Sequence, residues 1–173
     1  MNDGPLNYTI RALTSDDQLI IWDLLYEALW VPADKQPWPR EFVYGPELRR
    51  YAEDYGKPTD IGFAAVDPDG TIMGATWARL LQGEEKGYGY VDNETPELGI
   101  SLFAPYRGQG IGTALLERLI EEAATRFPSI SLSADAGNPA VRIYKKLGFE
   151  VVRQEGNGFV MKRRFNAARA ASE

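Results

Sequence analysis

The amino-acid sequence predicts a protein of the α/β or α+β class. In the second half of the chain, short apolar runs typical of strands alternate with segments of helical periodicity. The whole chain has 173 residues, of which 44% are hydrophobic, which is the size and composition of one globular domain. We therefore expect residues 1–173 to fold as a single domain, with a frayed tail over 166–173.

The first half of the chain is expected to contain one helix of several turns and three strands. Thr14 or Ser15 can cap a helix over 16–30, and acidic residues in its first turn suit the positive end of the helix dipole. The following segment is rich in proline and aromatic residues, and a short helix is expected over 46–56. Strands are expected over 8–12, 61–66 and 71–80, the last two joined by a turn at Asp67–Gly70.

After a polar loop, the second half is expected to alternate strands with helices. One amphipathic helix begins at Ile111 and ends before Pro128. A second is expected over 138–148, because Asn138 can cap it and Gly148 can end it. The strands are expected over 97–103, 130–134, 150–154 and 159–163, the last two forming a hairpin.

The chain contains no cysteine and no histidine. This composition excludes disulfide bonds, thiolate nucleophiles and catalytic triads built on histidine, and it excludes most zinc sites. Acid–base chemistry must therefore fall to Asp, Glu, Tyr, Lys, water or the backbone. We expect no metal centre.

Charge and hydropathy argue against nucleic acid and membrane as partners of this protein. The formal net charge is −6 and the isoelectric point is about 4.8, whereas nucleic-acid-binding surfaces are basic. No apolar run reaches the roughly 18–20 residues of a membrane-spanning helix, and the first residues lack the basic and apolar parts of a signal peptide. We therefore expect a cytoplasmic protein that binds neither nucleic acid nor membrane.

A glycine-rich turn stands directly before the first amphipathic helix of the second half. Gly108, Gly110 and Gly112 follow Arg107 at every second position. The first amide groups of a helix lack partners within it, and together with the helix dipole they attract an anion. Glycines let the backbone approach that anion closely, and arginine adds a positive charge suited to phosphate. The turn therefore predicts a pyrophosphate cradle, and the alternative is a tight turn that only joins strand to helix.

Two common phosphate-binding motifs fit this turn poorly. A P-loop ends in Gly-Lys-Ser/Thr, but here Gly112 is followed directly by Thr113. A dinucleotide-binding fingerprint that starts at Gly108 would require glycine at position 113. A nucleotide-binding protein is therefore kept only as an alternative.

The turn instead resembles a signature of the GNAT family of N-acetyltransferases. The spacing Arg107-x-x-Gly110-x-Gly112 is similar to the family's R/Q-x-x-G-x-G/A motif. The order of the expected elements is also similar to that family's order, and the resemblance covers about residues 8–165. A second segment resembles the family's N…A…Y-x-x-x-G-F pattern, with Asn138, Ala140 and Tyr144–Phe149.

The resemblance implies a GNAT fold, which is a mixed central sheet of about six to seven strands flanked by about four helices. In this fold two neighbouring strands splay apart, and acyl-CoA occupies the cleft between them. The resemblance thus implies acetyl-CoA as the co-substrate. Its pantetheine arm would contact Asn138 and would bond to the backbone of Ile100, Ser101 and Leu102.

The cradle would then hold the pyrophosphate of CoA. Arg107 would lie beside this group. The amides that face it would be those of Gly108, Gln109, Gly110, Ile111, Gly112 and Thr113.

The resemblance also implies catalytic groups. Tyr144 corresponds to a tyrosine that protonates the departing thiolate, and the alternative is an aromatic side chain that fills the core. Glu97 occupies about the place of a glutamate that takes a proton from the amine directly or through water, and the alternative is a carboxylate in solvent. The carboxylates left open as rival bases are Glu94, Asp92 and Asp135.

The implied function is transfer of an acetyl group from acetyl-CoA to a primary amine. Because the chain has no cysteine to carry an acyl group, direct attack in a ternary complex is the simplest mechanism. The alternative is a non-catalytic acyl-CoA-binding sensor of the same fold. The acceptor stays open among a small amine, a drug, an amino acid and a peptide amine, and a homodimer also stays open.

The acceptor wall is expected in two segments, 30–55 and 84–94. The acidic residues of the second segment could attract an amine, and the alternative is a solvated loop. The aromatic side chains considered for the wall are Trp30, Trp38, Tyr44, Tyr88 and Tyr90.

Overall fold

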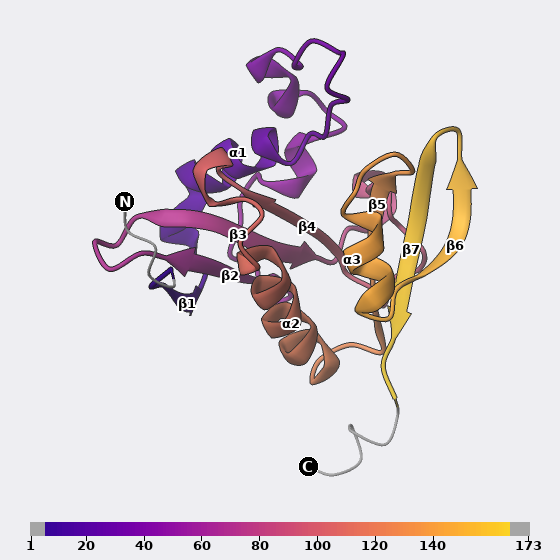
Figure 1. Ribbon diagram of the computed structural model, residues 1–173. Coiled ribbons are helices and arrows are strands. Elements are labelled where there is room, and N and C mark those ends of the chain that lie inside the picture. Colours follow the sequence, from indigo (N-terminus) through magenta and orange to yellow (C-terminus); the bar gives the residue numbers. More distant parts are fainter. Residues whose placement is uncertain (1–5, 167–173) are drawn as a thin grey trace.

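A computed structural model of the protein describes residues 6–166, and its centre is a seven-stranded sheet in the order β1-β2-β3-β4-β5-β7-β6 (Figure 1). Neighbouring strands are antiparallel except β4 and β5, which are parallel. The mixed sheet expected from the sequence is therefore confirmed. The strands are β1 (Thr9–Ala12), β2 (Ile61–Val66), β3 (Ile72–Arg79), β4 (Glu97–Leu102), β5 (Ser129–Asp135), β6 (Glu150–Glu155) and β7 (Gly158–Arg164).

Helices cover both faces of the sheet. The first helix, α1 (Gln18–Glu27), packs on β3 and β4, and α2 (Ile111–Ala124) packs on the opposite face of β2 and β3. The third, α3 (Val141–Lys146), shares the core of α2. Because β2 and β3 are covered on both faces, every residue in them is buried, which explains why they form continuous apolar runs.

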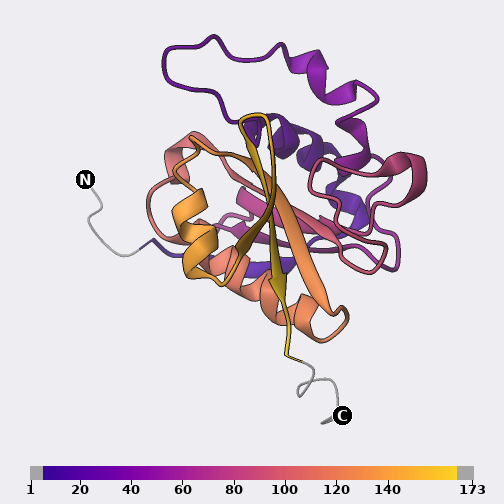
Figure 2. The same ribbon diagram turned by 90° about the vertical axis from the view of Figure 1, so that its right-hand side faces the viewer.

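The 3-10 turn Ser15–Asp17, which leads directly into α1, has the expected capping chemistry. The Thr14 hydroxyl accepts a hydrogen bond from the Asp16 amide (3.3 Å), and the Thr14 amide donates to the Asp17 carboxylate (2.9 Å). The helix ends at Glu27, earlier than expected, so Trp30 lies in the loop that follows. Both views place this following segment at the same end of the molecule as the tip of the β6–β7 hairpin (Figures 1 and 2).

The helix expected over 46–56 is not formed, and only a short 3-10 turn occurs at Arg49–Tyr51. The carbonyl groups that a helix would use are taken by the buried guanidinium of Arg79. It bonds to the carbonyl oxygens of Arg50 (2.9 Å), Glu53 (2.6 Å) and Asp54 (3.2 Å), and it pairs with Asp60. Tertiary hydrogen bonds have therefore replaced the local helical ones.

The second half follows the expected order with shorter helices. The α2 helix stops at Ala124, before Pro128, and α3 begins at Val141, after the turn at Asn138. Gly148 has φ +92°, as a residue that ends a helix requires. The part of the expected frayed tail that follows Asn166 lies outside the described residues. No helix within 6–166 is long and apolar enough to cross a membrane.

The parallel strands β4 and β5 meet at only one place. Glu97 pairs with Ser131, and the Ser131 amide donates to the Pro96 carbonyl (3.0 Å). Each strand is otherwise fully paired to its other neighbour, β3 or β7. The two strands therefore diverge toward their carboxyl ends, which confirms the splayed pair expected in the sheet.

Candidate active site

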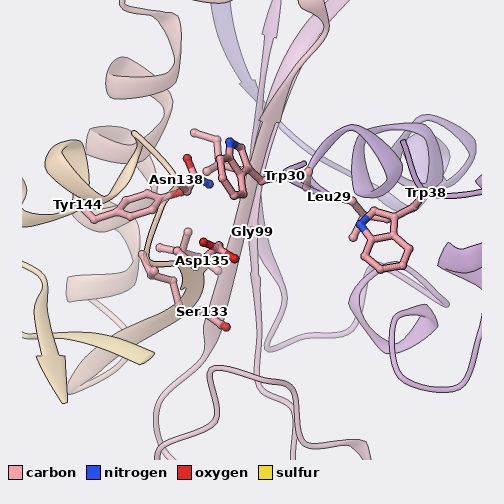
Figure 3. A pocket seen from close by; sticks show the side chains of 13 residues that line it. Leu29, Trp30, Trp38, Gly99, Ser133, Asp135, Asn138 and Tyr144 are labelled. Carbon is pink, nitrogen blue, oxygen red and sulfur yellow. The ribbon is translucent and has the colours of Figure 1, made fainter. Parts of the chain in front are cut away.

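A cavity of about 260 Å³ lies where β4 and β5 diverge. Figure 3 shows the side chains that surround it. Its wall combines parts of five segments: Leu98–Ile100 of β4, Leu132–Asp135 of β5, Asn138, Tyr144 of α3, and the segment after α1 with Ala28, Leu29, Trp30 and Trp38.

Alternation along the strands gives this cavity two sides. Leu98, Ile100, Leu132 and Ala134 belong to the core beneath α2 and α3. The residues between them therefore face the layer of α1. We call the part with Asn138 and Tyr144 the α3 side, and the part with Trp30, Trp38, Ser133 and Asp135 the α1 side.

Tyr144 supplies a protonated hydroxyl on the α3 side. Its ring is 7% exposed and packs edge-on against Phe149, with the ring centroids 6.2 Å apart. Its hydroxyl points toward Asn138 and Trp30 (Figure 3), and no described residue hydrogen-bonds to it. Burial raises the pKa of Tyr144 to about 12, so the hydroxyl keeps its proton at neutral pH. The arrangement suits a donor better than a base.

Asn138 lies beside Tyr144 on the same side. Its Oδ1 accepts a hydrogen bond from the Ala140 amide (3.0 Å), which fixes the side chain at the turn before α3. Both residues singled out in the second sequence motif therefore line the cavity.

The glycine-rich turn adopts the conformation that its sequence requires. Gly108 (φ +74°) and Gly110 (φ +84°) are left-handed, and a Cβ on either would meet no atom within 4 Å. Gly112 lies closer to the sheet, where a Cβ would make ordinary van der Waals contacts with Leu102 (3.6 Å) and Ile100 (3.7 Å). The start of α2 thus lies against β4, while the space at Gly108 and Gly110 stays open.

The backbone amides of this turn are free to bind a ligand. Within the described part of the chain, no acceptor is found for the N–H groups of residues 108–113, and the first amide of α2 with an acceptor is that of Ala114. A row of such amides at the start of a 14-residue helix is suited to an anion.

Arg107 is held by other parts of the fold. Its Nε donates to the Leu102 carbonyl (2.9 Å), and its guanidinium pairs with Glu27 (2.9 Å). The side chain therefore links the end of β4 to α1, in addition to bringing positive charge to the turn.

The three β4 residues expected to meet pantetheine differ in the direction of their side chains. Ile100 lines the cavity, whereas the Ser101 hydroxyl donates to the Leu24 carbonyl (2.6 Å) and Leu102 packs against Gly74. The backbone groups of Ile100 and Leu102 point to the edge of β4 that faces β5, which has no strand partner beyond Glu97. Those of Ser101 point to β3, because Phe103 donates to the Met73 carbonyl and hydrogen-bonded residues alternate along an antiparallel pair.

Glu97 is a buried carboxylate at the closed end of the splay. Its Oε1 accepts hydrogen bonds from the Tyr51 hydroxyl and the Gly89 amide, both at 2.8 Å, while Oε2 has no partner. Desolvation raises the pKa of Glu97 to about 7, although those two hydrogen bonds lower it. The residue does not line the cavity, because the Gly87–Gly89 loop covers it. A side chain at either glycine would collide with the carboxylate.

The rival carboxylates lie in different surroundings. Partial burial raises the pKa of Asp92, but hydrogen bonds from Thr95, Glu94 and Lys162 outweigh this effect and lower it overall. Glu94 is exposed and does not line the cavity. Asp135 stands on the α1 side at the end of β5. Two carboxylates thus remain near the splay, Glu97 at its closed end and Asp135 on its open side.

Two of the five aromatic residues considered for the acceptor wall line the cavity, Trp30 and Trp38. Tyr44 packs on Trp22 instead, and the hydroxyls of the other two bond to loop residues: Tyr88 to Glu47 and Tyr90 to Asn93. The sequence interpretation did not identify Tyr51, Gly87 or Gly89. The repeated glycines of the Gly-Tyr-Gly segment were the available signal for a loop in close contact with another group.

Comparisons with known proteins agree with this geometry. Residues 22–149 match the acetyltransferase (GNAT) family. The chain is 24% identical over 151 residues to the SPbeta prophage-derived uncharacterized N-acetyltransferase YokL of Bacillus subtilis (strain 168), covering 83% of this chain and 76% of that protein. It is 33% identical over 135 residues to the mycothiol acetyltransferase of Arthrobacter sp. (strain FB24), covering 71% of this chain but only 39% of that protein.

A solved structure shows the same fold. The structure of yncA from Salmonella typhimurium, solved with its cofactor acetyl-CoA, superposes with a TM-score of 0.66 at 20% identity, covering 92% of this chain and 95% of that one. The family match spans most of this chain, including the glycine-rich turn and the Asn138–Phe149 segment. The chain therefore belongs to the acetyltransferase (GNAT) family.

Proposed function

We propose that this protein transfers an acetyl group from acetyl-CoA to a primary amine by direct attack within a ternary complex. The observation that carries the proposal is the cavity at the β4–β5 splay, which has a row of free amides near one side and carboxylates near the other. Such an arrangement brings two substrates together from opposite faces of the sheet.

Acetyl-CoA would bind along the α3 side. The amides of residues 108–113 suit its pyrophosphate, because they face open space and have no acceptor within the described residues. The unpaired edge of β4 offers the backbone N–H and C=O groups of Ile100 and the N–H group of Leu102 to the pantetheine amides, whereas the Leu102 carbonyl is taken by Arg107. Asn138 offers an amide beside them.

The amine would approach from the α1 side and attack the thioester carbonyl carbon. As the carbon–nitrogen bond forms and the carbon–sulfur bond breaks, the Tyr144 hydroxyl donates its proton to the departing sulfur. The proton lost by the amine passes to Glu97 through water, since the carboxylate lies behind the Gly87–Gly89 loop. A pKa of about 7 suits Glu97 to this exchange near neutral pH.

The test is CoA release from acetyl-CoA across a panel of polyamines, amino acids, aminoglycosides and peptides. A thiol-reactive dye reports free CoA without background, because the chain contains no cysteine. Amine-dependent release is the expected result. If acetyl-CoA binds but no amine stimulates release, the result would support a non-catalytic acyl-CoA sensor instead.

A further inference from the structure

The α1 side of the cavity has an unusual balance of charge. Its wall is made by two indole rings, the side chain of Leu29, the hydroxyl of Ser133 and the carboxylate of Asp135. None of the described residues that line the cavity is a lysine or an arginine. A ligand on this side therefore meets aromatic surface and negative charge, with no cation to pair with an anionic group.

Asp135 is fixed in place by its own turn. Its Oδ1 accepts a hydrogen bond from the Gly137 amide (2.8 Å), while no described residue hydrogen-bonds to Oδ2. Strand alternation places it on the same face of β5 as Ser133, and both are exposed. The carboxylate thus keeps one oxygen available at the mouth of the cavity.

Trp30 and this carboxylate both lie close to Gly137. A Cβ built on Gly137 would lie 3.3 Å from both Trp30 Cη2 and Asp135 Oδ1, so the glycine lets the indole and the carboxylate share one turn. Figure 3 shows Trp30 beside Asn138, above Asp135, and Trp38 farther out beyond Leu29. Trp38 is 48% exposed, which leaves much of its surface free to contact a ligand.

These features favour one chemical class of acceptor. Indole faces attract organic cations and pack well on apolar bodies, and a carboxylate forms charge-assisted hydrogen bonds with an ammonium group. A ligand carboxylate placed here would instead face the negative charge of Asp135, with no lysine or arginine in the cavity wall to pair with it. Like charges placed side by side weaken binding. The protein's net charge of −6 also favours the approach of a cationic ligand over an anionic one.

We infer that the α1 side takes the acceptor as an organic cation, an amine with an aromatic or apolar body and no carboxylate. Asp135 pairs with the ammonium group, and Trp30 and Trp38 hold the body. The inference rests on the proposed acetyl transfer and gives Asp135 the role of a specificity-determining residue, distinct from the proton acceptor Glu97. In the proposed reaction the cavity of about 260 Å³ would also hold the acetyl end of the co-substrate, which leaves room for only a narrow part of the acceptor.

The test compares three acceptors that share the phenethylamine core: phenethylamine itself, phenylalanine amide and phenylalanine. We expect kcat/KM for the two compounds without a carboxylate to exceed that for phenylalanine at least tenfold. In Asp135→Asn, which can still accept the Gly137 hydrogen bond, KM for phenethylamine should rise about fivefold and the preference over phenylalanine should shrink. The matched control is Asp69→Asn, which removes the same charge from the exposed β2–β3 turn and should change neither value.

Binding measurements separate this inference from the proposed function. Calorimetry should show phenethylamine binding more tightly than phenylalanine to the CoA-loaded protein, and Asp135→Asn should bind acetyl-CoA as well as the natural protein does. Equal use of phenylalanine, an unchanged preference in Asp135→Asn, or no binding of any of the three compounds at millimolar concentration would overturn the inference alone. Failure to bind acetyl-CoA at all would overturn the proposed function instead.

Discussion

Glu97 shows how a single residue acquires its chemistry from its surroundings. In solution a glutamate is ionised at neutral pH, but here burial opposes the charge more than the bonds from Tyr51 and Gly89 favour it. The sequence placed Glu97 correctly at the start of β4. It could not show the burial, because Tyr51 lies far away in the sequence and the Gly87–Gly89 loop covers the carboxylate only once the chain has folded.

The first prediction concerns the pH dependence of activity. Only the ionised form of Glu97 can accept a proton, so kcat/KM should rise with pH and level off above about 7. Glu97→Gln should lower kcat roughly 100-fold and remove this rise. Steady-state rates between pH 5.5 and 9 measure both effects, with Glu94→Gln as the control. A normal profile in Glu97→Gln would exclude this carboxylate as the proton acceptor.

Glu97 should also affect stability. Its pKa is about 7 in the folded protein, above its ordinary value of 4.5, so the folded state favours the neutral form. The contribution of Glu97 is therefore complete below about pH 4.5 and is lost as pH rises through about 7. At pH 8, Glu97→Gln should be more stable by up to about 3 kcal/mol in urea unfolding, and the gain should vanish near pH 4.5.

A further prediction at this scale concerns Tyr144. Tyr144→Phe keeps the ring and its contact with Phe149 but removes the hydroxyl that faces the cavity. We expect kcat to fall roughly 10- to 100-fold while the affinity for acetyl-CoA stays within about twofold. Full turnover in this variant would assign Tyr144 to packing alone.

At the scale of elements, local sequence signals succeeded where the local chain determines the structure. The capped 3-10 turn before α1, the left-handed glycines before α2 and the β6–β7 hairpin were all predictable, because each depends on neighbouring residues. The segment 46–56 was not, because its carbonyl groups bond to Arg79, which lies on a strand far along the sequence. The end of α1 was also overestimated, which moved Trp30 out of the expected helix and into the cavity wall.

The glycine-rich turn gives a prediction for ligand binding. Gly110→Asp would place a strained side chain and a negative charge among the free amides of the turn, so acetyl-CoA affinity should fall at least tenfold by calorimetry. The control is Gly70→Asp, because Gly70 has nearly the same φ (+86°) and equally open surroundings in the β2–β3 turn. If both variants lost affinity equally, the loss would be explained by impaired folding and not by the charge placed in the turn.

Arg79 gives a prediction for stability. Its guanidinium lies in the interior with Asp60, and the two side chains are 4% and 3% exposed. Arg79→Met would leave Asp60 and three carbonyl groups without their partner, which should cost roughly 3–5 kcal/mol in urea unfolding. Arg49→Met, at an exposed ion pair with Glu53, should cost less than about 1 kcal/mol. Similar losses in the two variants would contradict the role assigned to Arg79.

The whole molecule consists of two sheet segments that meet at the Glu97–Ser131 pair. Antiparallel pairing is continuous through β1–β4 and again through β5, β7 and β6 (Figure 1). The sequence predicted the strands themselves, and the resemblance predicted their divergence. No local pattern encodes the divergence, because it depends on which residues of β4 and β5 pair, and the two strands lie far apart in the sequence.

This architecture predicts how amide hydrogen exchange responds to acetyl-CoA. The inner edges of β4 and β5 have no strand partner beyond their single pair, so some of their amides should exchange quickly in the free protein. Binding should slow exchange at residues 99–102 and 108–113, while residues 61–66 remain unchanged. Protection elsewhere with none in these segments would place the co-substrate at a different site.

The splay also bears on how the protein avoids self-association. Unpaired strand edges usually invite another polypeptide to add a strand, and proteins guard their outer edges against this. Here two such edges face each other across a cavity walled by Trp30 on one side and Tyr144 on the other. We expect this cavity to admit a thin, flexible molecule more readily than a second polypeptide strand. The same geometry thus leaves backbone hydrogen-bonding groups of β4 and β5 available to a small ligand and shields them from the strand addition that leads to aggregation.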